Sequence, residues 1–272
     1  MNEEEYFYLK LQIRELLDID INAYKSLQMR RRLETFVARR KSISAFQFCK
    51  SLKQDQETLK ALKDTITINV TEFFRDAEQF RHLEKVILPE FLRQRSHLNI
   101  WAAGCSTGAE PYSLAILLDE LSSARDHRIL ATDIDTDVLA QARDGGPYLP
   151  NEVQNVPKGL LEKYFTAGER GYMIAEKMRR EVLFRKHNLL SDGFQIGFDI
   201  VLCRNVIIYF SDEAKATLFS RFRTSLKPKG VLFIGGTEAL LPGNSLGFEQ
   251  LTTNFYRKSA LPVVDAKRAK AA

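Results

Sequence analysis

Two glycines close together predict a turn that binds a ligand. Gly104 and Gly108 follow the apolar run LNIWAA and precede a helical pattern that starts near Glu110. Glycines behind a strand let the backbone turn sharply and let a ligand approach it closely. The turn lacks the Lys-Ser or Lys-Thr pair of a phosphate loop, and the carboxylate of Glu110 would repel an anion. It therefore suits a cationic or neutral polar group.

A second acidic residue ends the next expected strand, RILATD. Asp133 in that position can accept hydrogen bonds from both hydroxyls of a ribose. A glycine turn with a strand-end acid fits an adenosine-containing ligand without phosphates, of which S-adenosylmethionine is the common one. NAD and FAD compete for this interpretation, and the missing third glycine disfavours both. The alternative is that Gly104 and Gly108 only shape a tight turn and that Asp133 caps the following helix.

The apolar run FDIVLCRN ends in Arg204 and Asn205, before the second apolar run VIIYF. Polar side chains between two apolar runs are expected to point into a crevice. Tyr209 follows Asn205 by four residues and would share its face on a helical turn. Core packing of Tyr209, with its hydroxyl at the surface, is the alternative.

One more polar set precedes these strands, in ITINVTEFFRDAEQF. Asn69, Thr71 and Arg75 recur there at near-helical spacing, with two phenylalanines between them. Arg75 could hold a carboxylate near a methyl donor. The structural alternative is that Asn69 or Thr71 caps a helix.

The cysteines and histidines indicate neither a disulfide framework nor a metal site. The three cysteines form no CxxC pair, and none of the four histidines is spaced with another as a ligand pair. We expect no metal in this protein.

The elements that must position these residues change in character along the chain. Residues 1 to about 65 contain no glycine or proline and show apolar residues at helical spacing, with Ser44 as a candidate helix cap. From about residue 97, short apolar runs alternate with helical segments, which predicts a mostly parallel sheet. The alternation breaks between residues 145 and 188, where a small antiparallel insertion is expected. The helical stripes comprise Tyr6, Leu9, Ile13, Leu16 and Leu17, then Leu27, Leu33, Phe36 and Val37, then Phe46, Phe48 and Leu52.

The predicted fold is therefore α/β, with an all-α N-terminal domain over residues 1–68. A Rossmann-like domain follows over residues 69–260, with the antiparallel β insertion at about 149–187. Residues 261–272 are expected to be a flexible tail.

The charge of the chain permits an anionic partner. The formal net charge is +5 and the isoelectric point about 9.0. The densest positive patch lies in the helical region and is either a solvated helix face or a docking face for an acidic partner. The patch comprises Arg30, Arg31, Arg32, Arg39, Arg40 and Lys41. No apolar run approaches the ~18 residues of a membrane span, and no signal peptide is evident, so we expect a cytoplasmic protein without membrane insertion.

Taken together, several motifs resemble the chemotaxis receptor methyltransferases, the CheR family. NVTEFFRD, WAAGCSTGAEPYSLA, ATDIDTDVLAQAR, HNLL and FDIVLCRNVIIYF occur in this order, and INAYKSLQMRRRLE resembles that family's N-terminal domain. The likeness covers roughly residues 5 to 258. It is specific as a set, although each motif alone would be weak.

The resemblance implies transfer of methyl groups from S-adenosylmethionine to glutamate side chains on the cytoplasmic helices of chemoreceptors. S-adenosylhomocysteine is the implied product, and sensory adaptation is the implied role, with the enzyme recruited to membrane receptor arrays. Arg75 and Tyr209 match positions that place the reacting centre. The positions that match cofactor contacts are Asn69, Thr71, Arg75, Gly104, Glu110, Asp133, Asn188, Leu189, Arg204 and Asn205.

The sequence departs from the family pattern in two places, and two rival functions are compatible with it. Gly235-Gly236-Thr237-Glu238 stands where members often carry Gly-His-Ser-Glu, and the short turn of the insertion favours an enzyme that does not grip a receptor tether. An RNA methyltransferase and a non-catalytic S-adenosylmethionine-sensing scaffold are the rivals. An RNA methyltransferase usually has an aromatic platform for a base, and this sequence shows none. A scaffold that only senses the cofactor would not need Arg75 and Tyr209. We expect a monomer that binds no nucleic acid.

Overall fold

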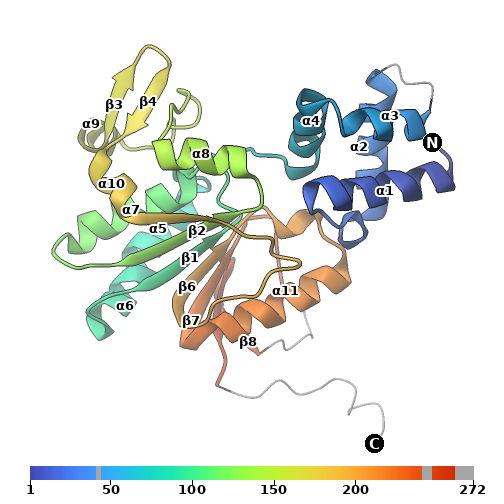
Figure 1. Cartoon of the computed structure of the whole chain (residues 1–272). Helices are drawn as coiled ribbons and strands as arrows, with labels where there is room; N and C mark the ends of the chain where they lie inside the picture. Colours follow the sequence, from blue (N-terminus) through green and yellow to red (C-terminus); the bar gives the residue numbers. More distant parts are fainter. Residues whose placement is uncertain (41–43, 241–246, 261–272) are drawn as a thin grey trace, which may run out of the picture. The chain divides into compact units, whose positions relative to one another are not determined.

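A computed structural model describes residues 1–40, 44–240 and 247–260 (Figure 1). Lys41 and the expected tail, residues 261–272, lie outside the described residues. The chain forms two compact units. Unit 1 consists of Met1–Asn69 with Tyr209–Ala216, and unit 2 of Val70–Ile208 with Thr217–Ala272. Throughout the described ranges, every helix is too short or too polar to span a lipid bilayer.

Unit 1 is helical, and its helices begin at residues that can satisfy free backbone N–H groups. Asn2 and Glu5 form a capping box at the first helix. The side chain of Ser44 accepts a hydrogen bond from the N–H of Gln47, which confirms the expected cap, and Asp55 caps the last helix. The helices are α1 (Glu3–Leu17), η1 (Ile21–Ala23), α2 (Ser26–Arg39), α3 (Ala45–Leu52) and α4 (Gln56–Thr67).

Two members of the expected apolar stripes do not belong to the core of unit 1. Leu27 is 75% exposed and Phe46 is 40% exposed, whereas Met29 and Phe48 are buried. Each exposed residue precedes its buried neighbour by two positions, which is about 200° around an α-helix. The pairs therefore point to opposite sides of α2 and α3, and only one member of each can face the core.

Unit 2 is built on a seven-stranded sheet whose order is β5-β2-β1-β6-β7-β9-β8. The first five strands run parallel, and β9 and β8 add antiparallel pairs at one edge. This confirms the expected Rossmann-like α/β architecture. The strands are β1 (Asn99–Ala103), β2 (Arg128–Asp133), β5 (Val182–Lys186), β6 (Phe198–Cys203), β7 (Leu226–Ile234), β8 (Phe248–Thr252) and β9 (Phe255–Lys258).

Helices connect the parallel strands and also precede them. The helices before the sheet are α5 (Ala77–His82), the π-helical turn η2 (Leu83–Ile87) and α6 (Leu88–Gln94). The connecting helices are α7 (Ala109–Ser122), α8 (Thr136–Asp144) and α11 (Asp212–Ser225), the last preceded by the 3₁₀ turn η3 (Ile207–Tyr209). Strand β1 has β2 on one side and β6 on the other, so the chain changes direction there. Ligands of such sheets bind outside the carboxyl ends of the strands at that point.

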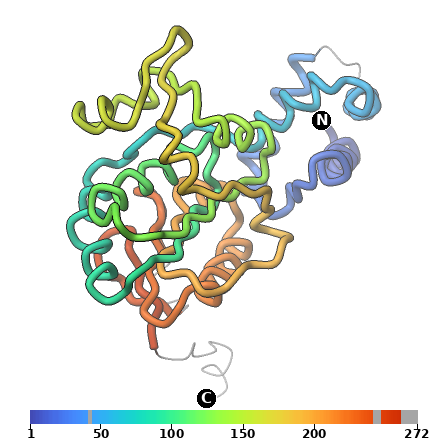
Figure 2. The backbone as a smooth tube through the Cα atoms, turned by 60° about the vertical axis from the view of Figure 1, so that its left-hand side comes forward, coloured from blue at the N-terminus to red at the C-terminus, as the bar shows by residue number. Residues whose placement is uncertain are grey.

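A small antiparallel hairpin, β3 (Phe165–Gly168) and β4 (Gly171–Ile174), stands out from the main sheet in both views (Figure 1 and Figure 2). It is flanked by α9 (Lys158–Tyr164) and α10 (Glu176–Arg180). The expected insertion extended to residue 187, but Val182–Lys186 forms β5, the parallel edge strand of the main sheet. The alternation of buried Val182 and Phe184 with exposed neighbours resembles an antiparallel strand, although here it results from an edge position.

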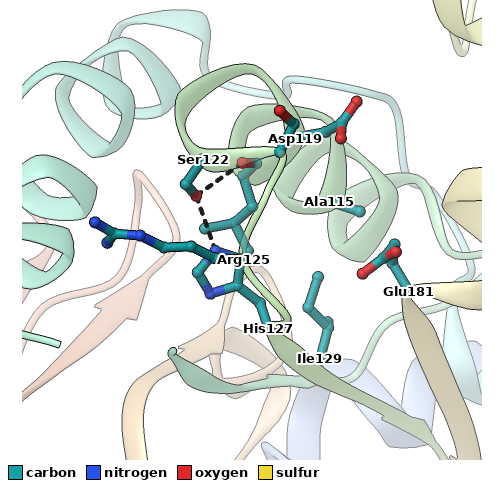
Figure 3. A pocket seen from close by; sticks show the side chains of 9 residues that line it. Ala115, Asp119, Ser122, Arg125, His127, Ile129 and Glu181 are labelled. Carbon is teal, nitrogen blue, oxygen red and sulfur yellow. Dashed lines mark hydrogen bonds between the residues drawn. The ribbon is translucent and has the colours of Figure 1, made fainter. Parts of the chain in front are cut away.

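His127 directly precedes β2 and therefore lies at the amino ends of the strands, away from their carboxyl ends. It lines a small pocket (Figure 3). Its Nδ1 accepts the N–H of Leu98 at 3.1 Å, and its Nε2 lies 2.8 Å from Ser122 Oγ, which itself donates to the carbonyl of Leu118. The ring is therefore a neutral imidazole with its proton on Nε2. Burial, and secondarily the charge of Arg125, lower the pKa of His127.

We expect this histidine to make the fold acid-sensitive. Below about pH 6.5 the unfolded chain takes up a proton that the folded ring refuses, so stability falls with falling pH, by at most about 1.4 kcal/mol per pH unit. Asp119 and Glu181 line the same pocket. The informative quantity is therefore the difference between wild type and His127→Asn, measured by urea unfolding from pH 7.5 to 5.5. Parallel pH profiles for the two proteins would contradict the assignment.

Candidate functional site

The glycine turn between β1 and α7 has the conformation that its residue types allow. Gly104 has φ +77° and donates its N–H to the carbonyl of Thr132 at 2.7 Å, and Gly108 has φ +90° where α7 begins. A Cβ on Gly104 would lie 2.4 Å from Val206 Cγ2. The first glycine is therefore needed both for its backbone conformation and for the close approach of the segment after β6.

Two hydroxyl groups of this turn have no partner within the described protein. Ser106 Oγ and Thr107 Oγ1 are buried and make no hydrogen bond, although buried polar atoms are nearly always paired. The carbonyl of Thr107 accepts the hydroxyl of Tyr148 at 2.8 Å, which fixes the turn from the other side. A rigid turn with orphaned hydroxyls fits a polar ligand such as S-adenosylmethionine.

Asp133 lies beside this turn and accepts two backbone hydrogen bonds. Its Oδ2 accepts the N–H of Ser106 at 2.8 Å and its Oδ1 that of Asp135 at 3.0 Å. Burial raises the pKa of this carboxyl, and the two N–H groups oppose that rise. The cap of α8 is Asp135, which accepts the N–H of Asp137, so the alternative that Asp133 caps this helix is wrong. Asp133 instead joins the β1 and β2 turns, and each oxygen retains a lone pair for a ligand.

Glu110 has a cationic partner within the protein. Its Oε2 accepts a hydrogen bond from Nη1 of Arg204 at 3.0 Å, and both side chains are largely buried. Burial raises the pKa of Glu110, while Arg204 and then Arg75 oppose that rise. The sequence interpretation explained Glu110 only by a cationic ligand. The structure adds that Arg204 already balances its charge.

Arg204 connects the end of β6 to the segment before α5. Nη2 donates to the carboxylate of Asp76 at 2.7 Å and to the carbonyl of Arg75 at 2.9 Å. The guanidinium carbon lies 5.2 Å from the ring centre of Phe80 and 4.6 Å from that of Phe233. The side chain is 1% exposed. Arg204 is thus the central cation of the site and holds Arg75 in place.

The segment that contains Asn69, Thr71 and Arg75 is not helical. Helix α5 begins only at Ala77, so the near-helical spacing was misleading and neither Asn69 nor Thr71 caps it. Phe73 and Phe74 are buried, and their N–H groups donate to the carbonyl of Glu152 and to Ser113 Oγ. These two aromatic anchors fix an irregular segment in which Phe74 and Asp76 adopt positive φ. Arg75 donates to the carbonyl of Val70 at 3.0 Å, whereas Asn69 belongs to unit 1, where it bonds Thr67.

The turn after β5 contains Asn188 and Leu189, and it lies next to Asp133. The N–H of His187 donates to the carbonyl of Asp133 at 2.9 Å. Asn188 is buried, and its side-chain oxygen accepts the N–H of Leu190 at 3.0 Å. Leu189 is also buried. The contact through His187 brings this turn to the same edge of the sheet as the glycine turn.

Asn205 adopts φ +59°, and its neighbourhood contains a carboxylate that the sequence did not reveal. Glu238 is 7% exposed and accepts the N–H groups of Gly235 at 2.6 Å, Asn205 at 3.1 Å and Ile208 at 3.1 Å. Burial raises the pKa of Glu238, and these N–H groups oppose the rise. Glu238 thus joins the turns after β6 and β7. The only sequence signal for it was the GGTE run at the end of an apolar strand.

Tyr209 belongs to unit 1, together with the basic residues of α2. Its carbonyl accepts the N–H of Lys25 at 2.9 Å, and the guanidinium carbon of Arg32 lies 5.9 Å from the centre of its ring. The ring is half-buried. The alternatives of core packing and a functional hydroxyl therefore both remain compatible with its position.

The basic patch divides into structural and available cations. Arg30 pairs with Glu3 and Glu34 and lies over the ring of Tyr6, so it links α1 to α2. Arg40 lies over the ring of Phe36, 4.7 Å from its centre. Arg32 also has a structural contact, because it donates to the carbonyl of Thr65 at 3.3 Å. An open groove of about 350 Å³ is lined by Arg31, Arg32, Thr35, Phe36, Arg39 and Thr65.

A Rossmann-like sheet with a glycine turn after its first strand and an acid at the end of the next is the arrangement expected of an S-adenosylmethionine-dependent methyltransferase. The family model described as "CheR methyltransferase, SAM binding domain" matches residues 69–257. The chain belongs to the CheR methyltransferase family.

Curated relatives agree with this assignment. The chain is 38% identical to the chemotaxis protein methyltransferase of Listeria monocytogenes, over 94% of this chain and 98% of that one. It is 37% identical to the protein of the same name in Listeria innocua, with the same shares covered. It is also 37% identical to chemotaxis protein methyltransferase 1 of Pseudomonas aeruginosa, over 65% of this chain and 68% of that one.

Proposed function

We propose that this protein transfers the methyl group of S-adenosylmethionine to glutamate side chains of chemoreceptors, giving glutamate methyl esters and S-adenosylhomocysteine. The observation that carries the proposal is the buried carboxylate of Asp133 and the largely buried one of Glu110 beside the glycine turn of a CheR-family domain. The strand-end carboxylate of Asp133 favours a ribose, and the turn lacks the Lys-Ser or Lys-Thr pair of a phosphate loop. We infer a role in sensory adaptation.

The residues around the turn would hold the cofactor through polar contacts. Asp133 would accept the ribose hydroxyls, and the orphaned hydroxyls of Ser106 and Thr107 would contact polar ligand atoms. Asn188 and Leu189 would lie on the adenine side, since their turn is bonded to Asp133. When bound, S-adenosylmethionine supplies an electrophilic methyl group on a sulfonium. Further contacts are proposed for Asn69, Thr71, Arg75, Gly104, Glu110, Arg204 and Asn205.

The acceptor needs no general base from the protein. A glutamate side chain has an ordinary pKa of ~4.3 and is already anionic at pH 7. The site must supply orientation and partial desolvation of that carboxylate. Arg75 is suited to this task. Within the described chain its side chain donates one hydrogen bond, to the carbonyl of Val70, and this leaves its other N–H donors available.

We expect Arg75→Lys and Tyr209→Phe to lower turnover, each by about tenfold, through loss of positioning contacts. Lysine loses the planar fork of arginine, and phenylalanine loses only the hydroxyl. Cofactor affinity should change little for Tyr209→Phe. Steady-state kinetics with separately measured cofactor binding checks this, and unchanged turnover in both variants would refute the positioning role.

The groove of unit 1 is our proposed docking site for the glutamate-rich helices of the receptor. Charge reversal of Arg31 and Arg39, which in the described chain do not contact Tyr209, should raise the apparent KM for receptor at least about tenfold with little effect on kcat, because surface charge acts mainly on encounter. Arg14→Glu is a matched control, since Arg14 is exposed on α1 and does not line the groove. A KM that is insensitive to salt and to the double reversal would exclude this surface.

The decisive test of the function uses purified protein, S-adenosylmethionine labelled in its methyl group, and membranes that contain a chemoreceptor. Label on protein that mild base releases as methanol would establish a carboxyl methyl ester. Cofactor binding without label on the receptor would overturn the proposed substrate, and RNA would be the next acceptor tried. Absence of cofactor binding would overturn the proposed site.

A further inference from the structure

The turn after β5 is connected to helix α11 by Arg221. Nη1 of Arg221 donates to the carbonyl of Leu189 at 2.6 Å, and Nη2 donates to the carbonyl of Asp192. The guanidinium carbon lies 3.9 Å from the centre of the Phe194 ring. One planar side chain therefore holds the turn at two backbone positions and stacks on a third residue.

The turn itself, residues 187–192, has a defined internal structure. Asp192 Oδ2 accepts the N–H of Asn188 at 2.8 Å, and Asn188 Oδ1 accepts the N–H of Leu190 at 3.0 Å. The carbonyl of Asn188 accepts the N–H of Asp192 at 2.9 Å. These bonds shape the turn locally, but they do not hold it against the rest of unit 2.

The turn also contacts the rest of unit 2. His187 bonds Asp133 through its backbone and packs its ring on Trp101, and Phe194, two residues beyond the turn, packs on Trp101 and Phe222. Arg221 adds a contact to the carbonyl of Leu189 itself. Desolvation lowers the pKa of Arg221, while the carboxylate of Asp192 opposes this. Arg221 is partly removed from water, and its hydrogen bonds to two carbonyls offset that cost. These bonds fix the positions of the two carbonyls in the turn.

We propose that Arg221 is a positioning residue that holds residues 187–192 in the conformation that receives the adenine end of S-adenosylmethionine, and so sets cofactor affinity. This inference rests on the cofactor site proposed above. Arg221 touches no reacting atom, so it should affect the KM for cofactor and not the chemical step. Apparent affinity falls in proportion to the fraction of molecules whose turn is correctly placed.

The experiment compares wild type with Arg221→Ala, Arg221→Lys and Arg223→Ala. Arg223 is the matched control, because it lies on the same helix and donates to a backbone carbonyl, that of Gly247, away from this turn. S-adenosylhomocysteine is the probe in isothermal titration calorimetry. We expect a Kd about tenfold higher for Arg221→Ala, an intermediate value for Arg221→Lys, and no change for Arg223→Ala.

Two further measurements separate positioning from a general loss of structure. Hydrogen exchange should accelerate at the amides of residues 188–192 in Arg221→Ala, with β1 and β6 unchanged. With a receptor substrate, kcat at saturating cofactor should stay within about twofold of wild type while the KM for cofactor rises.

The outcomes distinguish this inference from the proposed function. If wild type fails to bind the probe, the proposed cofactor site is wrong and the inference falls with it. If wild type binds and Arg221→Ala binds equally well, the inference alone is overturned, and the other contacts of the turn suffice to place it. Equal weakening by Arg221→Ala and Arg223→Ala would also overturn it, since both would then act through global stability.

Discussion

Replacement of Arg204 by methionine should lower the free energy of unfolding by about 3–5 kcal/mol and weaken S-adenosylhomocysteine binding by more than about tenfold. Methionine keeps an unbranched apolar stem beside the rings of Phe80 and Phe233 but lacks the guanidinium that lies over them. It leaves Glu110 as a buried carboxylate without its cation, and it frees the carbonyl of Arg75. Urea unfolding and calorimetric titration measure the two effects.

The pH dependence of this variant provides its internal control. Burial already raises the pKa of Glu110, and removal of Arg204 removes the main opposing charge. A carboxyl whose pKa is raised in the folded state lowers the free energy of unfolding only where it is ionised in the unfolded chain. This loss is absent below the pKa of the unfolded chain, ~4.3, and grows as the pH rises above it. The deficit of Arg204→Met should therefore shrink from pH 8 to pH 5. Glu110→Gln in the same background should remove that slope, and a deficit that is independent of pH would contradict the charge-burial explanation.

Gly104→Ala is the second substitution with a large expected effect, a loss of about 2–4 kcal/mol of stability. The positive φ is strained for alanine, and the added Cβ would lie 2.4 Å from Val206 Cγ2. Because Val206 follows Arg204 and Asn205, relief of the clash would displace the polar end of β6. Binding of S-adenosylhomocysteine should fall together with stability.

Gly159→Ala is the matched control, because Gly159 lies in α9 and an added Cβ there meets no atom within 4 Å. Alanine at that position should raise stability by up to about 1 kcal/mol. Gly104→Ala combined with Val206→Ala should recover the steric part of the loss and retain the part due to φ. The measurement is thermal unfolding of all four proteins, and a Gly104→Ala variant as stable as wild type would show that the turn rearranges without cost.

Local sequence patterns were sufficient for the class of fold and for the edge of the sheet that carries the site. Gly104, Asp133 and Arg204 each follow an apolar run, and parallel strands bring such positions to one edge. The cap at Ser44 was equally predictable, since it depends on residues three apart. By contrast, Leu27 and Phe46 were misjudged, because periodicity shows a repeat but not which side of the repeat is covered. The segment around Thr71 was misjudged because polar residues at helical spacing do not require a helix.

The sequence by itself determined where the proposed ligand-binding turn lies and which strands flank it, because glycine conformation and strand-end polarity are local properties. Only the tertiary structure decided the partners of the charges. Glu110 pairs with Arg204, 94 positions away, Glu238 collects N–H groups from two separate turns, and Arg221 reaches the turn after β5. Such pairings follow from which buried groups must be satisfied once the sheet is assembled, and sequence spacing carries no record of that requirement.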